Sequence, residues 1–154
     1  AFTDSDFAGD LDQRRSTSGE LFKKAGGAII WSASRQPLTT LSSCEAELVA
    51  SCSAAKTALW LQRFLGELGH DIKPIIQIDN TSTIQIIQNT QFSKRLKHVD
   101  IRYHSLREQA EAGNLDVVHV ASVENQANIC TKNLDKPAFQ RLRKLIGVKP
   151  CSAW

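Results

Sequence analysis

One feature constrains the fold more than any other: a predicted β-hairpin is followed by one long helix. Two β-rich runs, GELFKKA at 19–25 and AIIWSAS at 28–34, flank Gly26-Gly27, and a glycine pair between such runs is typical of a hairpin. A serine at 42 or 43 can cap a helix that we expect to end near Gly69. Apolar residues recur behind that cap at helical spacing: Leu48, Cys52, Ala55, Leu59, Leu61, Phe64, Leu65 and Leu68.

Shorter elements complete the pattern. Strands are predicted at 1–7, 74–79 and 115–121, and helical pieces at 81–89, 98–114, 122–132 and 137–147. A hairpin sheet followed by alternating strands and helices predicts a mixed sheet flanked by helices. We therefore expect an α/β fold in a single domain over 1–154, with 148–154 as a tail.

Composition supports a folded domain and excludes several other classes. The 154 residues are 42% apolar and 23% charged, which is ordinary for a globular protein. No apolar run approaches the roughly 20 residues of a membrane span, so no membrane partner is expected. The chain lacks an initiator Met and begins on a strand-like run, so we interpret it as a fragment of a longer protein. Its four cysteines form no CxxC pair, which favours reduced, buried thiols.

Charge is unevenly distributed along the chain. Residues 1–90 carry eight basic and ten acidic side chains, whereas residues 91–154 carry eleven and six. This difference suits a protein that gathers carboxylates in one part and meets a polyanion with another. Solvated surfaces also vary in charge, so the observation alone is weak.

Three carboxylates are candidates for one site. Asp4 ends the first predicted strand, Asp79 ends the strand at 74–79, and Glu47 lies early in the long helix. Ligands gather at the carboxyl ends of strands, and carboxylates that converge there call for hard cations such as Mg²⁺. Glu45 points away from Glu47 on the helix, and Glu47 lies nearer the apolar stripe. The alternative is that these acids only cap helices or form turns.

Seven segments, taken in order, resemble one family. They are TDSDFAGD with RRSTSG, then IIWSASRQP, LSSCEAEL, IDNTST, KHVDIRYH and ENQANICTKNL. Together they resemble the ribonuclease H domain of copia-type LTR retrotransposon polyproteins. The resemblance implies a ribonuclease H fold, with a five-stranded mixed sheet and helices on both faces. It also implies an endonuclease that uses two Mg²⁺ or Mn²⁺ ions to hydrolyse the RNA strand of RNA–DNA hybrids during reverse transcription.

The resemblance assigns the metal ligands residue by residue. Asp4, Glu47 and Asp79 match the first three acids, and Asn128 stands where the family has its fourth. An asparagine keeps a carbonyl oxygen but loses the negative charge. The chain is then an active variant with weaker metal affinity, an engineered substitution that holds substrate uncut, or a copy that binds without cleaving. Glu124, four residues earlier on an assumed common helix, is a candidate to replace the charge.

Basic residues near 94–104 are candidates for phosphate contacts. Nucleic-acid binding relies on Lys and Arg at phosphates, and a solvated helix face is the alternative. The candidate nucleic-acid-binding residues are Lys94, Arg95, Lys97, His98 and Arg102, with Arg14, Arg15, Asn80, Ser42 and Ser43 as further candidates. We interpret Trp31, Trp60 and Tyr103 as core anchors rather than base-stacking platforms.

The family also implies partners and a location. The expected partners are an RNA–DNA hybrid and a reverse transcriptase domain in the same polyprotein. The expected location is a cytoplasmic virus-like particle, or the nucleus. Two alternatives stay open: a domain that binds hybrid without cutting it, and a spacer domain that does neither.

Overall fold

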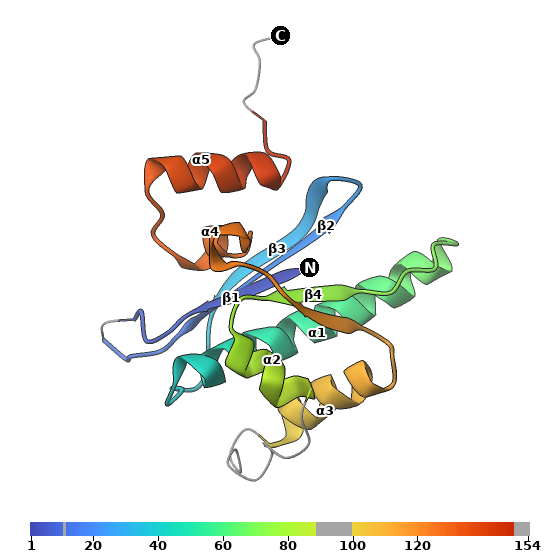
Figure 1. The fold of residues 1–154 in the computed structure, drawn as a ribbon, viewed down its shortest axis with the longest axis horizontal. Helices are drawn as coiled ribbons and strands as arrows, with labels where there is room; N and C mark the ends of the chain where they lie inside the picture. The colour runs from blue at the N-terminus through green and yellow to red at the C-terminus, as the bar shows by residue number, and fades with distance from the viewer. Residues whose placement is uncertain (11, 89–99, 150–154) are drawn as a thin grey trace.

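The computed structural model describes residues 1–10, 12–88 and 100–149, without the side chains of 100–102. It contains a five-stranded sheet in the order β3-β2-β1-β4-β5 (Figure 1). The strands are β1 (Phe2–Asp6), β2 (Thr17–Lys24), β3 (Gly27–Arg35), β4 (Ile75–Ile78) and β5 (Asp116–His119). β1, β2 and β3 pair antiparallel, whereas β4 pairs parallel with β1 and with β5. The predicted mixed five-stranded sheet is therefore confirmed.

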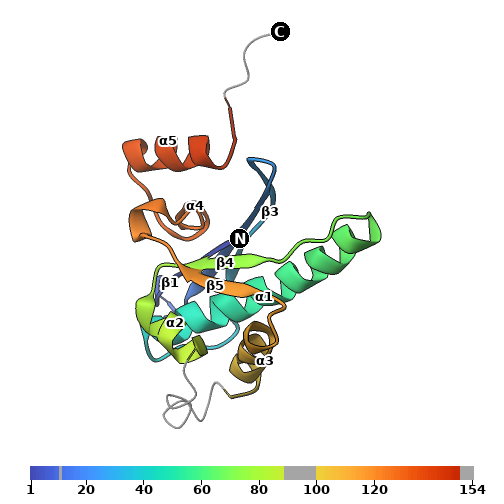
Figure 2. The same cartoon turned by 45° about the vertical axis from the view of Figure 1, so that its right-hand side comes forward.

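Helices cover both faces of the sheet, as predicted. Figures 1 and 2 show the helices labelled α1, α2 and α3 on one side of the sheet and those labelled α4 and α5 on the other. The first group is α1 (Ser43–Glu67), α2 (Thr81–Gln88) and α3 (Asp100–Glu111). The second group is α4 (Asn128–Thr131) and α5 (Lys136–Leu145), and the 3-10 helix η2 (Ser122–Glu124) lies between β5 and α4 in the chain. Among the described residues, no helix is long and apolar enough to span a membrane.

The hairpin forms one residue earlier than its glycine pair indicated. Gly27 already belongs to β3, and the turn residues are Ala25 and Gly26, with φ of 51° and 85°. Positive φ at both positions matches the twist of the adjoining strands. Gly26 meets this requirement without strain, while Ala25 adopts a conformation that glycine would take more easily.

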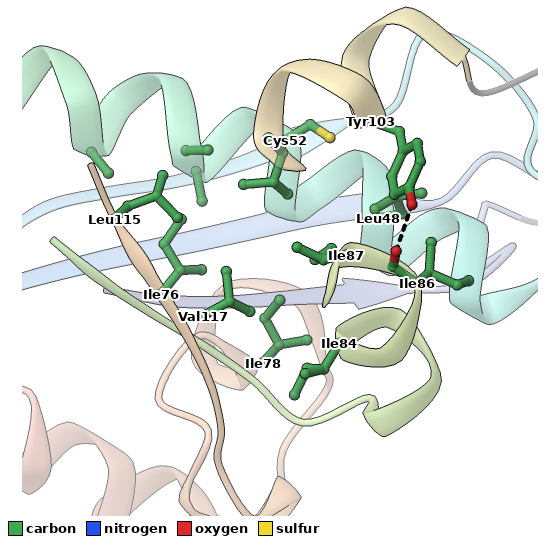
Figure 3. Close-up of a cluster of buried hydrophobic side chains, with 14 of the residues drawn as sticks. Leu48, Cys52, Ile76, Ile78, Ile84, Ile86, Ile87, Tyr103, Leu115 and Val117 are labelled. Carbon is green, nitrogen blue, oxygen red and sulfur yellow. Dashed lines mark hydrogen bonds between the residues drawn. The ribbon is translucent and has the colours of Figure 1, made fainter. Parts of the chain in front are cut away.

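The main core lies between α1 and the sheet. Ser42 caps α1, since its Oγ accepts a hydrogen bond from the backbone N–H of Glu45 at 3.1 Å. Behind the cap, the predicted apolar stripe contributes Leu48 and Cys52 to a buried cluster that α2, α3, β4 and β5 complete (Figure 3). Tyr103 of α3 is buried there and donates from its hydroxyl to the carbonyl of Ile86 at 2.6 Å. Its predicted role as a core anchor is confirmed.

A smaller cluster fills the opposite face. It consists of Phe2, Leu21, Val120, Ala127 and Ile146. This packing holds the segment that carries α4 against β1 and β2, directly beside Asp4.

Two tryptophans were predicted wrongly. Trp31 is 68% exposed and Trp60 is 57% exposed, so neither is a core anchor. Trp31 lies on the edge strand β3, and the carboxyl-terminal half of α1, which carries Trp60, extends beyond the sheet (Figure 1). Trp60 stacks on Phe64 with 5.5 Å between ring centroids. Trp60 follows Leu59 by one residue and so lies about 100° around α1 from the apolar stripe, whereas Leu65, on the stripe and farther along the helix, is still buried.

The helical piece predicted at 122–132 is also wrong as a single helix. The segment forms η2 and the four-residue α4, with Asn125, Gln126 and Ala127 between them. Glu124 therefore does not precede Asn128 by one turn of a common helix, and it is exposed. The prediction that Glu124 replaces the missing charge assumed one helix common to Glu124 and Asn128, and that assumption is wrong.

Candidate active site

Three carboxylates from distant parts of the chain converge at one end of the sheet. Asp4 comes from β1, Glu47 from α1, and Asp79 from the residue after β4. One carboxylate oxygen from each lies within 4.8 Å of the others. These are the three acids that spacing and resemblance had singled out, and the fold brings them together.

Local structure explains how each acid reaches the site. Side chains alternate along β1, so Asp4 points to the same face as Phe2, which packs in the smaller cluster. Ser5 donates its backbone N–H to Glu47 Oε1 at 3.0 Å, which ties α1 to β1. Asp79 follows Ile76 and Ile78, which are both fully buried in the main core. Buried and more exposed side chains thus alternate along β4.

Glu45, two residues before Glu47, has a different role. Its Oε2 accepts a hydrogen bond from the backbone N–H of Leu41 at 2.7 Å, and its own backbone N–H donates to Oγ of the capping residue Ser42. This reciprocal arrangement satisfies donors at the start of α1 in the manner of a capping box. Of the two acids on this turn, Glu47 alone is buried at the site, as predicted.

The electrostatics of the site favour protonation of its acids. Glu47 is 6% exposed, and burial raises its pKa from 4.5 to about 8, with the nearby Asp4 and Asp79 charges acting in the same direction. Burial also raises the pKa of Asp4, against the lowering effect of hydrogen bonds from Thr131 and Lys132. Desolvation and mutual repulsion therefore both oppose charge at the centre of this site.

The donor set fits a hard divalent cation. All three side chains offer carboxylate oxygens, the ligands that Mg²⁺ and Mn²⁺ prefer. Glu47 Oε2 is buried and has no hydrogen-bond partner. An orphaned buried oxygen in a group of acids needs an explanation, and a bound cation would supply it. The residues present thus fit a divalent ion such as Mg²⁺ or Mn²⁺.

Asn128 lies beside this group with both ends of its amide engaged. Its Nδ2 donates to the carbonyl of Ser122 at 2.7 Å, and its Oδ1 accepts from Lys132 Nζ at 2.8 Å. It is 6% exposed and is the first residue of α4. The donor that faces the Ser122 carbonyl is one that an aspartate would lack. The amide therefore suits this position for a structural reason.

Two residues that contact Asp4 were not predicted from the sequence: Thr131 and Lys132. Thr131 Oγ1 donates a hydrogen bond to Asp4 Oδ2, and Lys132 Nζ lies 2.9 Å from Asp4 Oδ1. Both residues stand in the segment ENQANICTKNL, three and four places after Asn128. That spacing places side chains on one face of a helical turn, and it was the available signal.

Two further residues hold this segment in place. The fully buried Asn125 donates from Nδ2 to the carbonyl of Thr3 at 2.8 Å and accepts the N–H of Ala127 at its Oδ1. Gly19 pairs with Asp4 across β1 and β2. A Cβ at Gly19 would lie 2.5 Å from Thr131 Cγ2, so only glycine lets α4 approach this closely.

The predicted nucleic-acid-binding residues are placed unevenly. Lys94, Arg95, Lys97 and His98 lie outside the described residues, as does the side chain of Arg102. Arg14, with φ of 55°, and Arg15 lie in the loop after β1, which leaves the sheet at the same end as Asp4.

The remaining candidates, Ser42, Ser43 and Asn80, lie at the N-termini of helices. Ser42 caps α1, and Ser43 is its first residue. Asn80 Oδ1 accepts the N–H of Thr83 at 3.0 Å at the start of α2. These bonds give Ser42 and Asn80 local structural roles, and nucleic-acid binding by them stays a prediction.

Comparisons with known proteins agree with this architecture. No family model matches the chain. The chain is 38% identical over 148 residues to a retrovirus-related Pol polyprotein from transposon TNT 1-94 of Nicotiana tabacum, and 35% identical over 150 residues to one from transposon RE2 of Arabidopsis thaliana. Each match covers 96% of this chain. The chain spans about a tenth of the length of these relatives, 11% and 10% respectively.

A solved structure supports the fold independently. It is the N-terminal RNase H domain of a Mycobacterium tuberculosis protein, determined as a fusion with maltose-binding protein. The match has a TM-score of 0.53 at 15% identity and covers 93% of this chain and 94% of that one. At this identity the likeness concerns the fold alone. The chain therefore belongs to the retrovirus-related Pol polyproteins of transposons, and its fold is an α/β ribonuclease H-like fold.

Proposed function

We propose that the chain is a divalent-metal-dependent endonuclease of copia type that hydrolyses the RNA strand of RNA–DNA hybrids during reverse transcription. One observation supports this most. One oxygen from each of Asp4, Glu47 and Asp79 lies within 4.8 Å of the others, and Glu47 Oε2 is buried without a hydrogen-bond partner. Such a group is costly to a fold unless a cation compensates it, so its presence is best explained by function.

Two of the carboxylates are held by hydrogen bonds. The Ser5 N–H holds Glu47 by Oε1, while Oε2 has no hydrogen-bond partner, and Thr131 and Lys132 orient Asp4. Divalent ions bound there would lower the pKa of an attacking water and stabilise the departing 3′ oxygen. The resemblance predicts two ions, with Asn128 as a weakened fourth ligand.

Substrate and partner belong to the same proposal. Arg14 and Arg15, in the loop after β1, are the residues that we propose contact the phosphate backbone near the carboxylates. The relatives are Pol polyproteins, of which this chain matches about a tenth. This supports work beside an adjacent domain of the same polyprotein, which we propose is the reverse transcriptase, in a cytoplasmic virus-like particle.

The test is cleavage of a labelled RNA–DNA hybrid beside RNA duplex and DNA duplex, in Mg²⁺, in Mn²⁺ and in EDTA. The proposal expects cleavage of the hybrid alone, only with metal, and its loss in Asp4→Asn. Cleavage that persists in EDTA, or that survives Asp4→Asn, would overturn the assignment.

A second candidate is a domain that binds hybrid without cutting it. The position of Asn128 favours it, since its amide is held between Ser122 and Lys132 and carries no charge. Both candidates expect hybrid binding that weakens with salt. If hybrid is bound but not cut by either the chain or Asn128→Asp, the binding function is the correct one.

A further inference from the structure

The ammonium group of Lys132 occupies a defined place between two of the predicted metal ligands. Its Nζ lies 2.9 Å from Asp4 Oδ1 and 2.8 Å from Asn128 Oδ1. Asp4 is fully buried, and the Lys132 side chain is 37% exposed. The lysine thus reaches inward from the protein surface to place a positive charge between the first and fourth ligand positions.

The backbone around Lys132 fixes this placement. Lys132 terminates α4, and its N–H donates to the carbonyl of Asn128 at 3.0 Å. The bond from Asn128 Nδ2 to the Ser122 carbonyl turns Oδ1 of the amide toward the lysine. Thr131, the preceding residue, holds the other oxygen of Asp4. Asn128 and Asp4, which supply the two oxygens beside Lys132, are therefore each held by a further hydrogen bond, with Ser122 and Thr131 respectively.

A count of charges agrees with this geometry. The three carboxylates carry three negative charges when ionised, and Asn128 adds none. One divalent ion together with the Lys132 ammonium balances them, whereas two divalent ions would leave an excess of positive charge beside a buried group. A carboxylate offers about four lone-pair sites, so Asp4 can accept from Thr131 and Lys132 and still bind an ion with Glu47 and Asp79.

We propose that Lys132 supplies, from within the chain, the positive charge that a second divalent ion would otherwise supply at Asp4 and residue 128. The site then binds one divalent ion, held by Asp4, Glu47 and Asp79. This inference rests on the proposed function, because it takes those three carboxylates to be metal ligands. It also gives Asn128 a role: a neutral acceptor that holds the lysine.

The test counts Mn²⁺ ions bound per chain, by the electron paramagnetic resonance signal of free Mn²⁺, and needs no substrate. The chain as given should bind one ion, and so should Asn128→Asp, in which Lys132 still fills the position. Lys132→Met should bind the first ion about tenfold more tightly because a nearby positive charge is gone. The double variant Asn128→Asp with Lys132→Met should bind two ions.

Two controls isolate the position of the charge. Lys132→Arg keeps a cation and should still bind one ion in the Asn128→Asp background. Lys144→Gln removes an exposed lysine of α5 and should leave both the count and the affinity unchanged. Circular dichroism of each variant confirms that it folds before its ions are counted.

The outcomes separate this inference from the proposed function. Two ions bound by the chain as given, or by Asn128→Asp alone, would overturn the role of Lys132 and leave the metal-dependent nuclease standing. One ion in the double variant would also overturn it. No ion bound by the chain as given would overturn both proposals.

Discussion

Asp4, Glu47 and Asp79 reach the site from strand β1, from a helix of 25 residues and from the residue after β4, whereas Asn128, Thr131 and Lys132 reach it from a helix of four and its C-cap. We call these the carboxylate half and the α4 half. In the carboxylate half Asp4 and Glu47 are buried and Asp79 is half-buried, and the Oε2 oxygen of Glu47 has no hydrogen-bond partner. The α4 half supplies donors to it.

The difference between the halves shows where this site is rigid and where it depends on a few bonds. Strands and a long helix fix the carboxylates through the main core, so their convergence survives the repulsion between them. The α4 half is held by Asn125, by the contact with Gly19 and by its bonds to Asp4. Substitutions in the two halves should therefore differ in kind, and the following measurements test this.

The largest effect is expected for Asp79→Asn on hybrid cleavage. Losing one ligand charge removes several kcal/mol of metal-based stabilisation, which corresponds to a rate loss of roughly a thousandfold. Asp116→Asn is the control, because Asp116 pairs with Lys73 at 2.6 Å on the surface, where such pairs contribute little. If the two variants cut at similar rates, the carboxylate half is not the catalytic half.

The next effect concerns the pH dependence of stability in metal-free protein. The Glu47 pKa is raised from 4.5 to about 8, so the native state keeps a proton that the unfolded state loses in this window. The free energy of unfolding should fall as pH rises from about 5 to about 8, by on the order of a few kcal/mol. Urea unfolding across this range in EDTA measures it, and added Mg²⁺ should stabilise most at the alkaline end.

Glu47→Gln should remove most of that slope, since the amide stays neutral and still accepts the Ser5 N–H. Glu45→Gln, on the same helix turn but outside the site, should keep it. A slope that is unchanged in Glu47→Gln would mean that burial of this carboxyl does not control the pH dependence.

A smaller effect is expected where α4 meets β2. Gly19→Ala places a methyl group 2.5 Å from Thr131 Cγ2, and overpacking of this kind costs about 1–3 kcal/mol of unfolding free energy. Gly27→Ala is the matched control, since a Cβ there meets nothing within 4 Å. Thermal unfolding of both variants decides the point, and equal stabilities would show that α4 can shift freely.

The smallest effect is expected from the hydroxyl of Thr131. Thr131→Val keeps the shape but removes the hydrogen bond to Asp4, at a cost of about 1 kcal/mol. Thr57→Val removes a longer contact to Glu20, at 3.3 and 3.4 Å, and should cost less. Denaturant unfolding compares the two, and the reverse order would show that the α4 half does not support Asp4.

The carboxylate half could be predicted because its signals are local. Alternation in β4 and the capped stripe of α1 each follow from residue spacing. Asp4, expected at the end of its strand, is instead the middle residue of β1. The α4 half could not be predicted in this way. Its helix has four residues, which is too few for a periodic pattern, and the segment before it is fixed by Asn125 bonding to β1.

By itself, the sequence determined the order of strands and helices, the choice of Glu47 over Glu45, and three acids that could share a site. Those properties depend on neighbours along the chain, where side-chain direction follows from backbone period. Only the tertiary structure decided that Trp31 and Trp60 are exposed and that Lys132 lies between Asp4 and Asn128. These properties depend on which distant segments pack together, because burial and ion pairing arise from contacts between residues far apart in the sequence.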